Sequence, residues 1–197
     1  MAARRLGEVG PELNVANFYA LEALYLLSKK AISRRKLMHE LDLSESKTRT
    51  LLSHLQEIKY IKPGTKGYAL TERGDKNAGK LARIIKDLKR IDLGKIVEKK
   101  SGFALNASSM KIPLRSYQLR DIAIRGGAEG ALVLKAERDK LKFVDSATGA
   151  YGGKLQHIEK QLKGLQNNDT VIVSFAQNAE NAKAGLWNII ENLINAG

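Results

Sequence analysis

Residues 43–74 read LSESKTRTLLSHLQEIKYIKPGTKGYALTERG, and this stretch decides how the first half of the chain folds. Apolar residues recur in it at the spacing of one helical face, at Leu51, Leu52, Leu55 and Ile58. Ser44 precedes them as an N-cap, so a helix is expected over about 45–59. The short runs YIK and GYAL then flank Pro63-Gly64-Thr65-Lys66, where Pro and Gly favour a β-hairpin. Thr71 is predicted to cap a long helix that continues to Ile91.

The helix over 45–58 has the two faces that docking in a DNA major groove requires. Its leucines turn toward a scaffold, and its opposite face offers short polar and basic groups. Lys and Arg can reach phosphates or guanine edges, while Ser and Thr reach phosphates at close range. The predicted DNA-binding residues are Ser46, Lys47, Arg49, Thr50 and Ser53 on this helix, with Lys62, Thr65 and Lys66 on the hairpin.

The charge of the chain favours a polyanionic partner. Among 197 residues, 34 Lys and Arg outnumber 21 Asp and Glu, for a formal charge of +13. Residues 1–91 carry 19 of the basic groups and only 10 of the acidic ones. Nucleic acid is therefore the first expectation and an acidic membrane surface the second. RNA is less favoured, because aromatic residues are only 6% and no aromatic-rich strands occur.

Two further helices are expected before the quoted stretch. Residues 14–30 form one, with Asn14 as its cap, and apolar groups reach nearly all round it. A helix of this kind is buried on more than one side, which suggests a homodimer that covers part of residues 15–27. Residues 33–41 form a short second helix capped by Ser33. No segment reads as a signal peptide or a membrane span, and there is no Cys, so a soluble cytoplasmic protein is expected.

The parts LMHELDLSESKTRTLLSHLQEIKYI (37–61), the hairpin and LTERG (70–74) resemble the winged helix-turn-helix domain of MarR-like and ArsR-like transcription regulators. The resemblance covers roughly residues 14–90. It implies that 45–58 is the recognition helix and that the helix after Thr71 supports dimerisation. Lys59 stands where the family often has Gly, and Thr48 where it often has Val. The chain also resembles archaeal winged-helix proteins with a C-terminal domain of unknown function, through LRDIAIRGGAEGALVLKAERDKLKFVD (119–145).

The expected fold class is α+β, with a winged-helix DNA-binding domain over 1–91 and an α/β dimerisation or effector-sensing domain over 92–197. In the second domain, strands and helices follow in the order β-α-β-β-α-β with a terminal helix, from about residue 102. This order fits a ferredoxin-like sandwich. The runs ALVL and TVIVSF are apolar without alternation, as is typical of central strands covered on both faces.

No catalytic or metal centre can be assembled from the sequence. His39, His54 and His157 show no ligand spacing, and there is no nucleophile motif. The stretch ATGAYGGKL (147–155) fails the phosphate-loop template in its glycine spacing and at Leu155. No cofactor or metal is therefore expected. A small-molecule effector is expected at the end of the strand in SFAQNAENA (174–182), with Asn178 as a plain helix cap the alternative. The predicted effector residues are Ser174, Gln177, Asn178 and Asn181.

Three functions remain open from the sequence. The first is a transcription regulator that binds duplex DNA as a homodimer. The second is an enzyme of cofactor metabolism in residues 92–197, fused to a DNA-binding head. The third is a scaffold whose winged helix binds protein. The charge split and the hairpin favour the first.

Overall fold

The computed structural model describes residues 17–107, 112–138, 140–144, 155–162 and 164–196. The chain divides into two compact units, one that ends at Ala82 and one that begins at Arg83. The boundary therefore precedes the expected one near Asp92, because residues 85–92 belong to the sheet of the second unit. Helices and strands are mixed, which confirms the α+β class.

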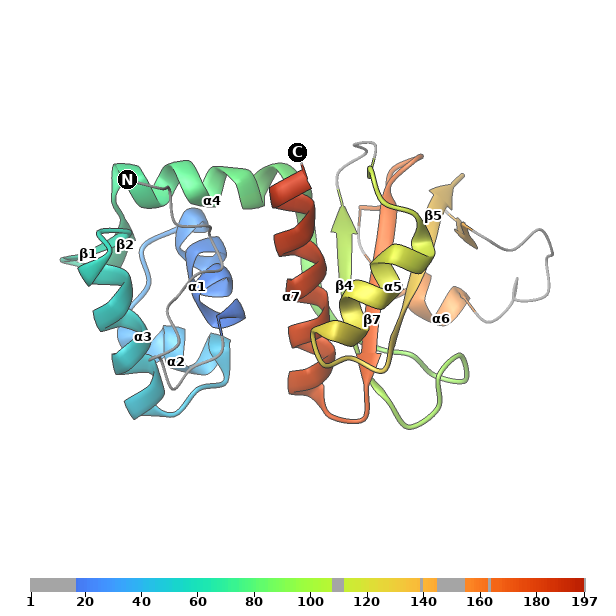
Figure 1. The fold of residues 1–197 in the computed structure, drawn as a ribbon, viewed down its shortest axis with the longest axis horizontal. Coiled ribbons are helices and arrows are strands. Elements are labelled where there is room, and N and C mark those ends of the chain that lie inside the picture. Colours follow the sequence, from blue (N-terminus) through green and yellow to red (C-terminus); the bar gives the residue numbers. More distant parts are fainter. Residues whose placement is uncertain (1–16, 108–111, 139, 145–154, 163, 197) are drawn as a thin grey trace. The chain divides into compact units, whose positions relative to one another are not determined.

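The first unit consists of helices around one short hairpin (Figure 1). Its elements are α1 (Phe18–Lys29), α2 (Arg34–Leu41), α3 (Glu45–Glu57), β1 (Ile61–Gly64), β2 (Gly67–Leu70) and α4 (Glu72–Ile84). Ser33 and Ser44 cap α2 and α3 by accepting the backbone N–H of Lys36 and Lys47, so both predicted caps are confirmed. Asn14, the cap expected for α1, lies outside the described residues.

Most of α1 is buried within the single chain, including Leu21, Leu24 and Leu27. Within the first unit it packs against α2, α3 and β2. Ile32 pairs with Tyr68 of β2 through two backbone hydrogen bonds of 3.0 and 2.9 Å, which ties the segment before α2 to the hairpin.

The second unit is a sheet with helices on both faces. Its elements are β3 (Ile85–Asp92), β4 (Ser101–Ala107), α5 (Ser116–Arg125), β5 (Gly130–Glu137), β6 (Lys140–Phe143), α6 (Gln156–Glu159), β7 (Thr170–Ala176) and α7 (Ala179–Ala196). Five strands of the described chain form an antiparallel sheet in the order β3-β4-β7-β5-β6. Helices α5 and α7 cover one face and α6 lies on the other (Figure 1).

The predicted element order from residue 102 is confirmed, but the ferredoxin-like arrangement is wrong. A ferredoxin-like sandwich would pair the first and third of its strands, which are β4 and β6 here, at the centre of the sheet. Instead β7 lies between β4 and β5, and β6 stands at the edge. The apolar runs did predict position correctly, since β5 and β7 are interior strands. Val171, Ile172 and Val173 of β7 are fully buried, as expected of a strand covered on both faces.

The helix predicted to run to Ile91 ends at Ile84, and β3 follows directly. Strand β3 is an edge strand, and Lys86, Asp87, Lys89 and Arg90 give it the charges that protect such edges from association. Its register on β4 shifts between Ile85 and Asp87. This bulge directs Lys86 to the carboxylate of Asp169, with Nζ 2.7 Å from Oδ2.

Asp169 is fully buried, and three donors converge on its Oδ2. They are Nζ of Lys86 at 2.7 Å, the backbone N–H of Gln166 at 2.9 Å and Nδ2 of Asn106 at 3.3 Å. These donors come from β3, from β4 and from the turn before β7. The cluster therefore joins three neighbouring strands at one end of the sheet.

None of the helices in the described ranges has the length and apolar character needed to cross a bilayer.

Candidate nucleic-acid interface

Helix α3 has the two faces that the sequence predicts. Thr48, Leu51, Leu52 and Leu55 are buried, whereas Ile58 follows the helix as its C-cap and is only half-buried. The hydroxyl of Thr48 donates to the backbone oxygen of Ser44 at 2.9 Å, so this polar side chain is satisfied inside the core. All the predicted DNA-binding residues are exposed, namely Ser46, Lys47, Arg49, Thr50, Ser53, Lys62, Thr65 and Lys66.

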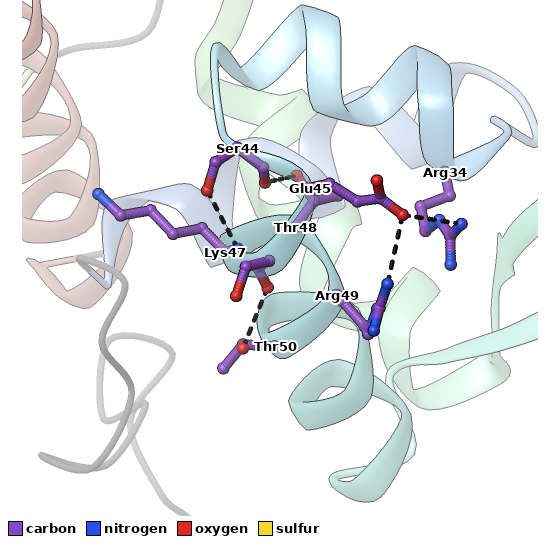
Figure 2. Close-up of polar contacts among 8 residues, drawn as sticks. Arg34, Ser44, Glu45, Lys47, Thr48, Arg49 and Thr50 are labelled. Atoms are coloured by element: carbon purple, nitrogen blue, oxygen red, sulfur yellow. Dashed lines mark hydrogen bonds and ion pairs between the residues drawn. The ribbon is translucent and has the colours of Figure 1, made fainter.

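The first turn of α3 carries a network of polar contacts (Figure 2). The Glu45 carboxylate lies between two guanidinium groups, with Oε1 3.2 Å from Nη2 of Arg34 and 3.3 Å from Nη2 of Arg49. Lys47 points away from this group in Figure 2. The hydroxyl of Thr50 donates to the backbone oxygen of Ser46 at 3.1 Å. A phosphate contact through this hydroxyl would give up that bond, at a cost of about 1 kcal/mol.

Three cations at the start of α2 were not among the DNA-binding residues predicted from the sequence. Arg34, Arg35 and Lys36 are all exposed, and the first turn of α2 contains no acidic residue. Positive charge at a helix N-terminus opposes the helix dipole, so this arrangement carries a local cost that an anion would relieve. The signal in the sequence is the run of three cations directly after a Ser cap. The Arg34–Glu45 ion pair brings the first turn of α2 beside that of α3.

Two glycines fix the geometry of the hairpin. Gly67 has a φ of +113°, and a Cβ there would lie 2.4 Å from the backbone oxygen of Ile32. Gly74, the last residue of LTERG, would place a Cβ 2.0 Å from the backbone oxygen of Tyr60. Thr71 accepts the N–H of Gly74 at 3.1 Å and donates to the backbone oxygen of Lys59 at 2.6 Å. The LTERG pattern therefore caps α4 and packs its first turn against the chain that enters the hairpin.

Helix α3 ends in a Schellman motif at Lys59. The N–H of Tyr60 donates to the oxygen of Leu55, and that of Lys59 to the oxygen of Gln56, both at 2.9 Å. Lys59 has a φ of +61°, in the left-handed region that favours glycine. This explains why a glycine at this position would suit the fold better.

Changing Lys59 to Gly is expected to stabilise residues 17–82 by about 0.5–1 kcal/mol, because relief of the left-handed strain exceeds the added freedom of the unfolded chain. Thermal unfolding followed by circular dichroism measures the change. Lys59→Ala is the matched control, since it removes the same charge and keeps the strain. Equal melting temperatures for the two variants would contradict the strain argument.

The predicted effector residues are only partly brought together at the surface. Ser174 is fully buried under α7, where a Cβ on Gly185 would lie 2.8 Å from its hydroxyl oxygen, so it does not share the exposed surface of the other three. Oδ1 of Asn178 accepts the N–H of Asn181 at 2.7 Å and so caps α7, which is the alternative role predicted for Asn178. Gln177 and Asn181 remain exposed.

Glu129 lies beside this strand end. Its carboxylate accepts the N–H of Gln177 at 2.7 Å and pairs with Lys100 at 2.5 Å. The hydrogen bond from Lys100, aided by that from Gln177, lowers the pKa of Glu129. The stretch 147–154, tested above as a phosphate loop, lies outside the described residues. Within the described ranges, no three His, Asp or Glu side chains gather where they could hold a metal ion.

Comparisons with known proteins match both parts of the chain. Residues 20–76 match the family model described as PH0730-like, N-terminal domain. Residues 96–193 match the model described as a domain of unknown function, DUF4443. None of the curated proteins matches. The solved structure titled hypothetical protein PH0730, from Pyrococcus horikoshii OT3, is similar with a TM-score of 0.68 and 23% identity, over 91% of this chain and 92% of that one. The chain thus shares its fold with an archaeal protein and is similar to PH0730-like domains in its first part and to DUF4443 domains in its second.

Proposed function

We propose that this protein is a transcription regulator that binds duplex DNA through a winged helix-turn-helix formed by α1–α4 and the β1–β2 hairpin. In this proposal α3 is the recognition helix and the hairpin is the wing. Residues 83–197 serve as a dimerisation or effector-sensing domain. The observation that carries the proposal is the separation of α3 into a buried apolar face and an exposed face with Lys47 and Arg49.

The distribution of cations supports this assignment. Exposed basic side chains are present on the start of α2, on α3 and on the hairpin, at Arg34, Arg35, Lys36, Lys47, Arg49, Lys62 and Lys66. Phosphate contacts of this kind supply most of the affinity and set the register on the duplex. Side chains of α3 would then read base edges in the major groove.

A salt titration tests the electrostatic core of the proposal. If five or so of these cations neutralise phosphates, the slope of log K against log salt is about −4 to −5 per protomer. The affinity for a duplex should then fall by roughly 10²–10³-fold between about 50 and 200 mM salt. Fluorescence anisotropy with a labelled duplex measures it. An affinity that does not change with salt would overturn the proposal, and the absence of binding at low salt would favour the scaffold function.

A homodimer would place two copies of α3 in successive major grooves. These grooves are about 34 Å apart on one side of the duplex, so bound sites should show two half-sites at that spacing. An effector bound to the second domain would regulate DNA affinity by shifting the spacing between the two helices. Genome-wide mapping of bound DNA shows whether such paired half-sites occur.

A further inference from the structure

The contacts of Glu45 point to a role beyond DNA binding as such, although the inference rests on the proposed function. Glu45 is the first residue of α3, in the turn that enters the groove in helix-turn-helix docking. An acidic side chain at this place faces a polyanion. A single carboxylate oxygen of Glu45 also forms ion pairs with two arginines, one from α2 and one from its own helix (Figure 2).

Stability does not account for this arrangement. The side chains of Arg34, Glu45 and Arg49 are 49%, 58% and 69% exposed. Ion pairs this exposed to solvent contribute little to folding. Their effect on the surface is larger, because the group presents one net positive charge where two free arginines would present two.

We propose that Glu45 determines specificity by penalising contacts of Arg34 and Arg49 with phosphate while permitting a contact of Arg49 with a base edge. A phosphate that approaches either guanidinium also approaches the carboxylate, and the like charges repel. The O6 and N7 acceptors of guanine are neutral and meet no such repulsion. Each guanidinium keeps further N–H donors beyond the Nη2 group that faces Glu45, so a base contact and the Glu45 contact can coexist.

Glu45 therefore lowers the affinity for DNA of random sequence and changes the affinity for the specific site only slightly. Non-specific binding depends on phosphate contacts alone, whereas specific binding adds base contacts. The carboxylate therefore lowers the first more than the second and widens the ratio between them. Glu45 acts here through the two arginines and is a specificity-determining residue of the proposed interface.

Glu45→Gln in the full-length protein tests the inference. With a random-sequence duplex, the affinity should rise about 3–10-fold at roughly 0.1 M salt, and the salt slope should steepen by about one, as for one further neutralised phosphate. With a duplex selected from a random library by the wild-type chain, the affinity should change by less than about 2-fold, so the ratio falls.

Glu72→Gln is the matched control. Glu72 is also the first residue of a helix and forms an ion pair with Lys76, four residues on, at 3.1 Å. It lies on α4 and not on the proposed recognition helix, so it does not belong to the proposed DNA-contacting face. Glu72→Gln should leave both affinities nearly unchanged. In a background with Arg34→Ala and Arg49→Ala, Glu45→Gln should raise the affinity for the random duplex no more than Glu72→Gln does.

The outcomes separate this inference from the proposed function. If the wild-type chain binds DNA with a steep salt dependence and Glu45→Gln behaves like Glu72→Gln, the specificity role is overturned and DNA binding stands. If Glu45→Gln weakens only the selected duplex, Glu45 contacts a base directly, which also overturns the inference. If no form of the protein binds DNA, the proposed function fails, and the inference with it.

Discussion

Replacing Lys47 and Arg49 together by alanine is expected to lower the affinity for duplex DNA by about 10²-fold near physiological salt. Both side chains are exposed on α3, and the buried face of the helix does not involve them. Each lost phosphate contact should also make the salt slope shallower by about one per protomer, so the change is about one where Arg49 contacts a base edge and about two where both side chains contact phosphate. Anisotropy titrations at several salt concentrations measure both quantities.

The folded state should survive this double change. Surface substitutions away from caps and cores usually alter stability by no more than about 0.5 kcal/mol, and alanine is a good helix former. Lys76→Ala with Lys80→Ala is the matched control, because it removes the same charge from exposed positions on α4. The control should keep the affinity within about 3-fold of the wild type. Equal losses in both double variants would mean that net charge, and not the α3 face, drives binding.

The local features of the first unit were predictable from the sequence because they depend on neighbours in the chain. Ser33 and Ser44 each accept an N–H from three residues on. The hairpin is also local, although its turn is shorter than expected, because Pro63 and Gly64 pair with Tyr68 and Gly67 and leave only Thr65 and Lys66 in the turn. The buried and exposed faces of α3 follow from helical spacing. Arg34 was missed because its place in the surface depends on a contact with Glu45, which lies on the next helix.

The second unit shows where such local reasoning fails. Residues 81–91 place Leu81, Ile84, Leu88 and Ile91 at helical spacing, so they read as one continuous helix with α4. Their partner strand, β4, begins only at Ser101, and pairing with it decides the outcome for residues 85–92. Tertiary context of this kind overrides helix propensity. The charged residues that protect β3 as an edge strand also interrupt the alternation of apolar and polar residues by which a strand is predicted.

Helix α6 is only four residues long for a similar reason. It ends at Glu159, and the side chain of Gln161 bonds to both backbone groups of Asp92, at 2.8 Å each. The backbone oxygen of Gln161 accepts from the ammonium group of Lys89. These bonds to the end of β3 compete with continuation of the helix, and no local pattern announces them.

The position of Ser174 could have been inferred more strictly. A strand covered on both faces has no exposed side, so a Ser in the middle of TVIVSFA must be buried whichever way it points. The prediction of central strands and the prediction of an effector contact at Ser174 were therefore in conflict. The exposed part of the predicted effector site begins only after Ala176, where β7 ends.

Removal of the Lys86 ammonium should destabilise the second unit by about 3 kcal/mol or more. In Lys86→Met the aliphatic length is kept, but the fully buried carboxylate of Asp169 loses its cation. An uncompensated buried charge costs far more than a lost surface pair. Trp187 is the single tryptophan of the chain and is buried on α7, so its fluorescence during denaturant titration reports unfolding of this unit.

Two comparisons make this prediction specific to burial. The Lys142–Glu137 pair has nearly the same length, 2.6 Å against 2.7 Å, but its side chains are 64% and 47% exposed. Lys142→Met should therefore cost less than about 1 kcal/mol. Asp169→Asn should cost less than Lys86→Met, because the charge that it leaves unpaired is the ammonium of Lys86, which is 30% exposed and can bind water, whereas the carboxylate of Asp169 is fully buried. If Lys86→Met lowered the free energy of unfolding no more than Lys142→Met does, the Asp169 carboxylate would have become hydrated or protonated in the variant. The contribution of the ion pair to holding the three strands together would then be contradicted.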